Sequence, residues 1–85
     1  MDTFKLKALL TAIEKGSMAK ASEEFAYTPS ALSHCINSLE KELGVKLLKR
    51  TYAGVEFTDE GELLFDKLQA VVNAEKELIK EAARI

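Results

Sequence analysis

The 85-residue chain lacks the sequence features that are typical of disulfide-bonded, membrane-spanning and secreted proteins. Its single cysteine, Cys35, has no partner for an internal disulfide. No apolar run approaches the roughly 18 residues that a membrane span needs, and no signal peptide is visible at the N-terminus. These shortages predict one small domain in a reducing, cytoplasmic setting, without a membrane as partner.

Residues that carry catalytic chemistry are equally scarce. There is one histidine, His34, no cluster of residues at metal-ligand spacing, and no glycine-rich loop that could cradle a phosphate. His34 and Cys35 are neighbours, but adjacent side chains on a helix point in different directions and cannot act as a base and its nucleophile. The sequence therefore predicts that the protein is not an enzyme and needs no metal or cofactor.

The charge balance is slightly acidic, with 12 Lys and Arg against 14 Asp and Glu. A formal net charge of −2 counts against a nucleic-acid partner, because such domains are often basic. The local distribution matters more than the sum, since salt screens each charge beyond about 8–10 Å.

The stretch from Thr28 to Gly44 carries the clearest pattern in the chain. Thr28 can cap a helix, Pro29 suits the first helical position, and Gly44 suits the left-handed residue that ends one. One face of this helix is apolar, with Leu32, Ile36, Leu39 and Leu43. The opposite face carries side chains that can form hydrogen bonds, namely Ser30, Ser33, His34, Asn37, Ser38 and Lys41. We interpret residues 28–43 as the reading helix of a DNA-binding module.

The elements around this helix fit the same interpretation. A first helix should be capped by Asp2 or Thr3 and close at Gly16, and a second, capped by Ser17, should end near Tyr27. Such a tight connection to the next helix is typical of a helix-turn-helix. Two β-capable runs, 45–51 and 55–58, flank a glycine-containing turn and predict a two-stranded hairpin, or wing.

The last predicted helix is capped by Thr58 and runs to the end of the chain. Its apolar stripe is wider than a coiled-coil seam and cannot be hidden by one helix alone, so self-association is expected. The residues assigned to dimerisation are Leu64, Leu68, Val71, Val72, Leu78 and Ile79. Glu75 lies within the stripe and should limit or orient the pairing. We divide the chain into a winged helix-turn-helix over residues 1–58 and a linker and dimerisation helix over residues 59–85.

Taken together, these pieces resemble the N-terminal domain of LysR-type transcriptional regulators. The resemblance covers essentially the whole chain, and it rests on residues 6–17, 19–22, 30–33, 39–40, 43–45, 47–48, 54–55, 57–58 and 60–61, with Phe25, Ile36 and Arg50. It implies a mainly α fold with three helices, a two-stranded wing and a long linker helix that forms a homodimer. It also implies a bacterial transcription factor that binds an interrupted inverted repeat in promoter DNA, with helix 28–43 in the major groove and the wing near the minor groove. Family members normally continue into an effector-binding domain of two α/β lobes, which is absent here, so we expect either an excised fragment or a natural short form.

The residues expected to contact DNA are Thr28, Ser30, Ser33, His34, Asn37, Lys41, Arg50, Thr51 and Tyr52. Ser33 matches a position that the family uses for DNA contact, Asn37 can pair with adenine, and Arg50 suits a phosphate or the minor groove. The sequence departs from the family where Gln or basic residues are common, at Pro29, His34, Asn37, Ala53 and Glu56.

These departures and the acidic charge keep a second hypothesis open. The chain would then be a dimeric winged-helix protein-interaction module with weak or lost DNA binding.

Overall fold

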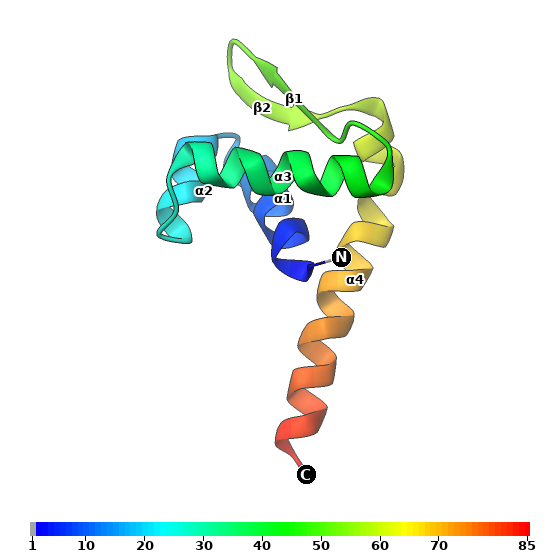
Figure 1. Cartoon of the computed structure of the whole chain (residues 1–85). Helices are drawn as coiled ribbons and strands as arrows, with labels where there is room; N and C mark the ends of the chain where they lie inside the picture. The colour runs from blue at the N-terminus through cyan, green and yellow to red at the C-terminus, as the bar shows by residue number, and fades with distance from the viewer. Residues whose placement is uncertain (1) are drawn as a thin grey trace.

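The computed structural model describes residues 2–85, which form four helices and one antiparallel hairpin (Figure 1). In chain order these are α1 (Thr3–Lys15), α2 (Met18–Glu24), α3 (Pro29–Leu43), β1 (Leu48–Thr51), β2 (Gly54–Phe57) and α4 (Asp59–Ala83). The prediction of a mainly α winged helix-turn-helix with a long final helix is confirmed. Across residues 2–85, no helix combines the length and the apolar character that a bilayer span requires.

Local side-chain chemistry starts each of the four helices. Asp2, Ser17, Thr28 and Thr58 each accept a hydrogen bond from a backbone amide of the first turn, at 2.9–3.2 Å. These caps satisfy donors that have no partner inside the helix. Gly16 and Gly44 end α1 and α3 with φ of 65° and 72°, as the sequence predicted.

The second helix is shorter than the sequence suggested. It was expected to end near Tyr27, but it ends at Glu24, and Ala26 has a φ of 57°. The amide of Tyr27 then donates to the Ser22 carbonyl at 2.9 Å. This left-handed turn redirects the chain, so α3 begins within five residues of the end of α2.

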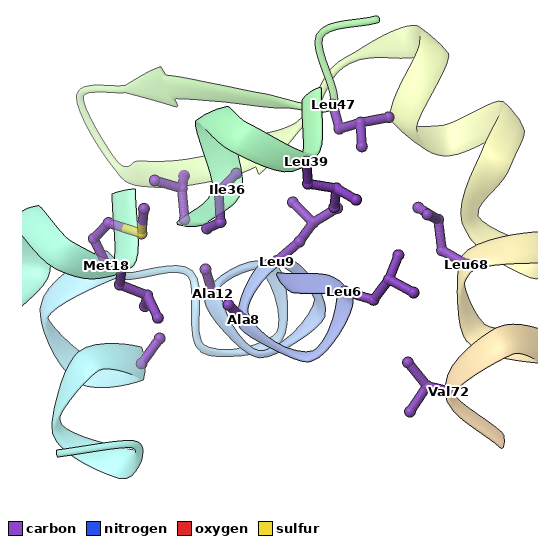
Figure 2. Packing of buried hydrophobic residues seen from close by; sticks show 13 residues of the cluster. Leu6, Ala8, Leu9, Ala12, Met18, Ile36, Leu39, Leu47, Leu68 and Val72 are labelled. Atoms are coloured by element: carbon purple, nitrogen blue, oxygen red, sulfur yellow. The ribbon is translucent and has the colours of Figure 1, made fainter. Parts of the chain in front are cut away.

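The core is centred on α1, which lies under α3 with α2 on one side and α4 on the other (Figure 2). Fully buried leucines and small alanines dominate it, namely Leu6, Ala8, Leu9, Ala12, Ala21, Leu32, Leu39 and Leu47, together with Ile36. Alanines at these positions allow the helices to approach closely. Of the predicted apolar face of α3, Leu43 in the last turn remains 40% exposed.

The hairpin is also shorter than predicted, because β1 begins at Leu48 and not at Val45. The register pairs Lys49 with Glu56 and Arg50 with Val55. The wing is held against the turn after α1, where the amide of Val55 donates to the Gly16 carbonyl at 3.3 Å. A side chain at Gly54, which has a φ of 133°, would place its Cβ 2.0 Å from the Gly16 oxygen, so this approach requires glycine.

The final helix has two halves with different surroundings. Its first half packs on the domain through Gly61, Leu68 and Val72, whereas its second half projects beyond the other elements (Figure 1). Leu68 and Val72 were assigned to dimerisation, but they are 5% and 4% exposed and point toward α1 (Figure 2), so they are core residues of the single chain.

Glu75 also differs from its expected role in the pairing stripe. Its carboxylate accepts a hydrogen bond from Thr3 and lies 2.8 Å from Lys7 Nζ, and both residues belong to α1. The hydrogen bond from Lys7, followed by that from Thr3, lowers the pKa of Glu75 below its usual value of 4.5. The charge is therefore compensated within the chain.

Candidate nucleic-acid interface

The outer face of α3 carries four of the predicted contact residues along one line. Ser30, His34, Asn37 and Lys41 are all exposed and follow one another at spacings of four, three and four residues. This spacing keeps them on one side of the helix, opposite the buried Leu32, Ile36 and Leu39. The face is polar, and the helix that carries it lies beside the wing in Figure 1.

The N-terminus of α3 forms one end of this face. Thr28 caps it through a 3.1 Å bond from the Ala31 amide, and the first turn contains no acidic residue. Pro29 has no N–H, so the Ser30 amide is the donor of this turn that remains for a ligand, at the positive end of the helix dipole. A phosphate oxygen is a suitable ligand for such an end.

A hydrogen bond connects α3 to the wing. Arg50 Nη2 on β1 donates to Ser33 Oγ on α3 at 2.7 Å, although the two residues are far apart in the sequence. A guanidinium has five N–H donors, so most of them remain available for a further acceptor. The bond brings two of the predicted contact residues into one surface.

A groove between α3 and β1 surrounds this bond. Its polar lining includes Ser33, Asn37, Lys46, Lys49 and Arg50. Next to it, a second hollow along the C-terminal half of α3 is lined by residues that include His34, Asn37 and Lys41. Asn37 belongs to both, so it lies at the middle of a continuous polar surface.

The remaining wing residues lie apart from this groove. Thr51 and the fully exposed Tyr52 are at the tip of the hairpin, where Thr51 Oγ1 accepts a 3.2 Å bond from the Ala53 amide. A shallow depression at the tip is formed with Gly16, Ser17 and other residues of the α1–α2 turn. This depression shares Arg50 with the groove, so a ligand that follows Arg50 from α3 to the tip would meet Thr51 and Tyr52.

The sequence did not reveal the role of Glu40, which is 6% exposed at the end of α3. Its Oε2 accepts hydrogen bonds from the backbone amides of Leu47 and Leu48, at 2.7 and 3.0 Å. These bonds fix the chain between α3 and β1 and explain why the strand starts only at Leu48. The available signal was an acidic residue next to Leu39, on the buried side of the predicted helix.

Lys5 on α1 supports α3 from below the outer face. Its Nζ donates to Ser38 Oγ at 2.9 Å and to Glu42 Oε1 at 2.5 Å. The hydrogen bond to Glu42 raises the pKa of Lys5 and lowers that of Glu42. Ser38 and Glu42 are thus bound to α1, and the outer face of α3 is narrower than the sequence pattern suggested.

Two further features bear on chemistry. Cys35 is a half-buried free thiol on the flank of α3. Within residues 2–85, no three His, Cys, Asp or Glu side chains are grouped so that they could hold a metal ion.

Comparison with known proteins gives consistent matches over the whole chain. Residues 4–62 match the family model for bacterial regulatory helix-turn-helix proteins of the lysR family. The uncharacterized HTH-type transcriptional regulator YeeY of Escherichia coli (strain K12) is 40% identical over 78 residues, which are 91% of this chain and 25% of that protein. The chain thus spans about a quarter of the length of such curated relatives.

Solved structures resemble it closely. A crystal structure of BenM_DBD in complex with catB site 1 DNA has a TM-score of 0.89 at 27% identity, covering 100% of this chain and 94% of that one. VV2_1132, a LysR family transcriptional regulator, has a TM-score of 0.92 at 26% identity, covering 99% of this chain and 29% of that one.

Proposed function

The chain belongs to the lysR family of bacterial regulatory helix-turn-helix proteins, and we propose that it binds duplex DNA as the DNA-binding domain of a transcription regulator. The relatives it matches are transcription regulators and not enzymes. Promoter DNA is in the bacterial cytoplasm, so the domain works there. The alternative of a protein-interaction module that has lost DNA binding finds no support among these relatives.

The observation that carries the proposal is the 2.7 Å bond between Arg50 and Ser33, which unites α3 and the wing in one polar surface. An α-helix about 10–12 Å wide fits the major groove of B-DNA, which is about 12 Å wide. The 15 residues of α3 extend about 22 Å, enough to follow several base pairs. Its outer face would then meet the base edges while the wing meets the backbone.

The proposed roles follow from the chemistry of each side chain. Asn37, at the middle of the surface, can form two hydrogen bonds with adenine, and His34 and Lys41 flank it one turn away on either side. Thr28 and Ser30 hold the helix N-terminus near a phosphate. Thr51 and Tyr52, beyond the groove, would reach the minor groove or the adjacent backbone.

Arg50 has a separate role from the helix residues. Its remaining N–H donors can bind a phosphate or enter the minor groove, and the bond to Ser33 fixes its direction. Ser33 can still donate its own hydroxyl hydrogen to the same backbone. This pair should supply affinity for any sequence, whereas Asn37 should supply base preference.

We also propose that residues 59–85 link and dimerise two such domains. Beyond Val72, α4 continues for about 16 Å without a buried residue. Leu78 and Ile79 in this part, and Val71 just before it, leave large apolar surfaces exposed. Leu64, at the start of the helix, is half-buried against the core. Pairing of the projecting halves would cover the exposed side chains and would present two α3 helices to an interrupted inverted repeat.

Fluorescence anisotropy with labelled duplexes tests DNA binding. Duplexes selected from a random library should bind the 85-residue chain in a saturable manner, and log K should fall with log salt at a slope of about −0.9 per neutralised phosphate. Arg50→Ala should weaken binding to selected and random duplexes alike, whereas Asn37→Ala should weaken mainly the selected ones, by about 1–3 kcal/mol.

Lys80→Ala is the matched control for charge, because Lys80 is exposed near the far end of α4. It should leave both affinities nearly unchanged. The proposal would be contradicted if the wild-type chain bound no duplex at low salt, or if Lys80→Ala weakened binding as much as Arg50→Ala.

A further inference from the structure

The outer surface of the wing carries one cross-strand pair of opposite charges. Lys49 on β1 and Glu56 on β2 are direct partners in the antiparallel register. Lys49 Nζ lies 3.8 Å from Glu56 Oε1, and the two side chains are 52% and 57% exposed. They project from the strand face opposite the one on which Arg50 and Val55 are paired.

This pair contributes little to the stability of the wing. An exposed ion pair is screened by water and salt, and holding two long side chains together costs conformational entropy. Glu40 provides the contrast, because that carboxylate is buried and accepts two backbone hydrogen bonds. Glu56 therefore needs another explanation, and it lies in the part of the chain that meets DNA.

Lys49 lines the groove between α3 and β1 together with Ser33, Asn37 and Arg50. Lys49 is next to Arg50 in β1, so its flexible side chain, once free of Glu56, could turn toward a phosphate bound beside Arg50. Glu56 opposes this contact in two ways: its carboxylate attracts the ammonium group, and its own negative charge repels the phosphate. Both effects operate over a few ångströms, well inside the screening length of about 8–10 Å.

We propose that Glu56 is a positioning residue that weakens the sequence-independent part of DNA binding by keeping Lys49 from the phosphate backbone. The inference rests on the proposed DNA-binding function. Phosphate contacts supply most of non-specific affinity, while base contacts supply discrimination. Weakening the phosphate contacts while the base contacts stay unchanged increases the ratio of specific to non-specific affinity.

Glu56→Gln tests the inference with almost no change in side-chain volume. Its affinity for a labelled random-sequence duplex is measured by anisotropy across a salt series. The released Lys49 should neutralise one more phosphate, so the salt slope should steepen by about 0.9. The ratio of variant to wild-type affinity should accordingly fall about 3.5-fold between about 50 and about 200 mM salt. The selected duplex should gain no more than the random one.

Two variants isolate the cause. The double variant Lys49→Gln and Glu56→Gln should return the slope to the wild-type value or below it. Glu77→Gln removes the same charge from the exposed, projecting half of α4, far from the wing (Figure 1), and should leave the slope unchanged. Circular dichroism checks that every variant is folded.

The possible results separate the two proposals. A wild-type slope in Glu56→Gln, or an equal gain in Glu77→Gln, overturns the role of Glu56 while DNA binding itself stands. A steeper slope that persists in the double variant also overturns it, because Lys49 would not be the group released. No saturable binding by the wild-type chain overturns the proposed function and this inference with it.

Discussion

Glu40→Ala should destabilise the domain severely, although Glu40 lies on the surface helix that is proposed to bind DNA. The carboxylate is 6% exposed and accepts the backbone amides of Leu47 and Leu48 at 2.7 and 3.0 Å. Leu47 is fully buried, so its amide cannot turn to water when the acceptor is removed. The amide of the half-buried Leu48 can recover part of its loss through water.

A hydrogen bond to a charged group contributes about 1.5–3 kcal/mol. One such bond lost in full and one lost in part suggest a decrease of about 3 kcal/mol in the free energy of unfolding. An 85-residue domain has about 4–13 kcal/mol in total, so this is a large fraction of its stability. At about 4–8 °C per kcal/mol for a domain of this size, Tm should fall by about 12–24 °C.

Thermal unfolding followed by circular dichroism at one fixed protein concentration measures the change, because self-association would make Tm depend on concentration. Glu40→Gln keeps one acceptor oxygen without the charge and should lose about half as much. Glu42→Ala, two residues away and exposed, is the control and should lower Tm far less. The reasoning would be refuted if the free energy of unfolding of Glu40→Ala lay within about 1 kcal/mol of the wild-type value. It would also be refuted if Glu40→Gln were less stable than Glu40→Ala.

Two further predictions concern α4. Val71→Glu should give monomers in sedimentation velocity, because it places a charge in the apolar surface that is proposed to pair. Asn73→Glu, on the far side of the helix, is the control and should remain dimeric. A dimeric Val71→Glu variant would show that the interface lies elsewhere. Glu75 has its pKa lowered chiefly by the Lys7 hydrogen bond, so its contribution to stability is present above an unfolded-state value near 4.5 and is lost as the pH falls below it. Glu75→Gln should therefore lose less stability than the wild type in urea unfolding between about pH 6 and about pH 3, and equal losses in the two proteins would contradict this.

The amino-acid sequence determined where the helices begin and where α1 and α3 end. Thr28 and Thr58 cap their helices through amides three residues ahead, and Gly16 and Gly44 adopt the left-handed conformation that ends one. These interactions are short-range, so the order of residues suffices to predict them. The polar face of α3 followed in the same way, because helical spacing alone brings Ser30, His34 and the other residues to one side.

Only the tertiary structure decided which side chains act across elements. Glu40 could not be assigned from sequence because its partners are amides seven and eight residues away, where the loop after α3 meets the start of β1. The Arg50–Ser33 bond likewise depends on how the wing packs against α3.

The apolar stripe of α4 shows the same limit. Its spacing predicts an apolar face but cannot say which part of that face a neighbour covers. The position of α1 decides this: it buries Leu68 and Val72, compensates the charge of Glu75, and leaves Leu78 exposed. Periodicity is a property of one helix, whereas burial is a property of the helices that pack against it.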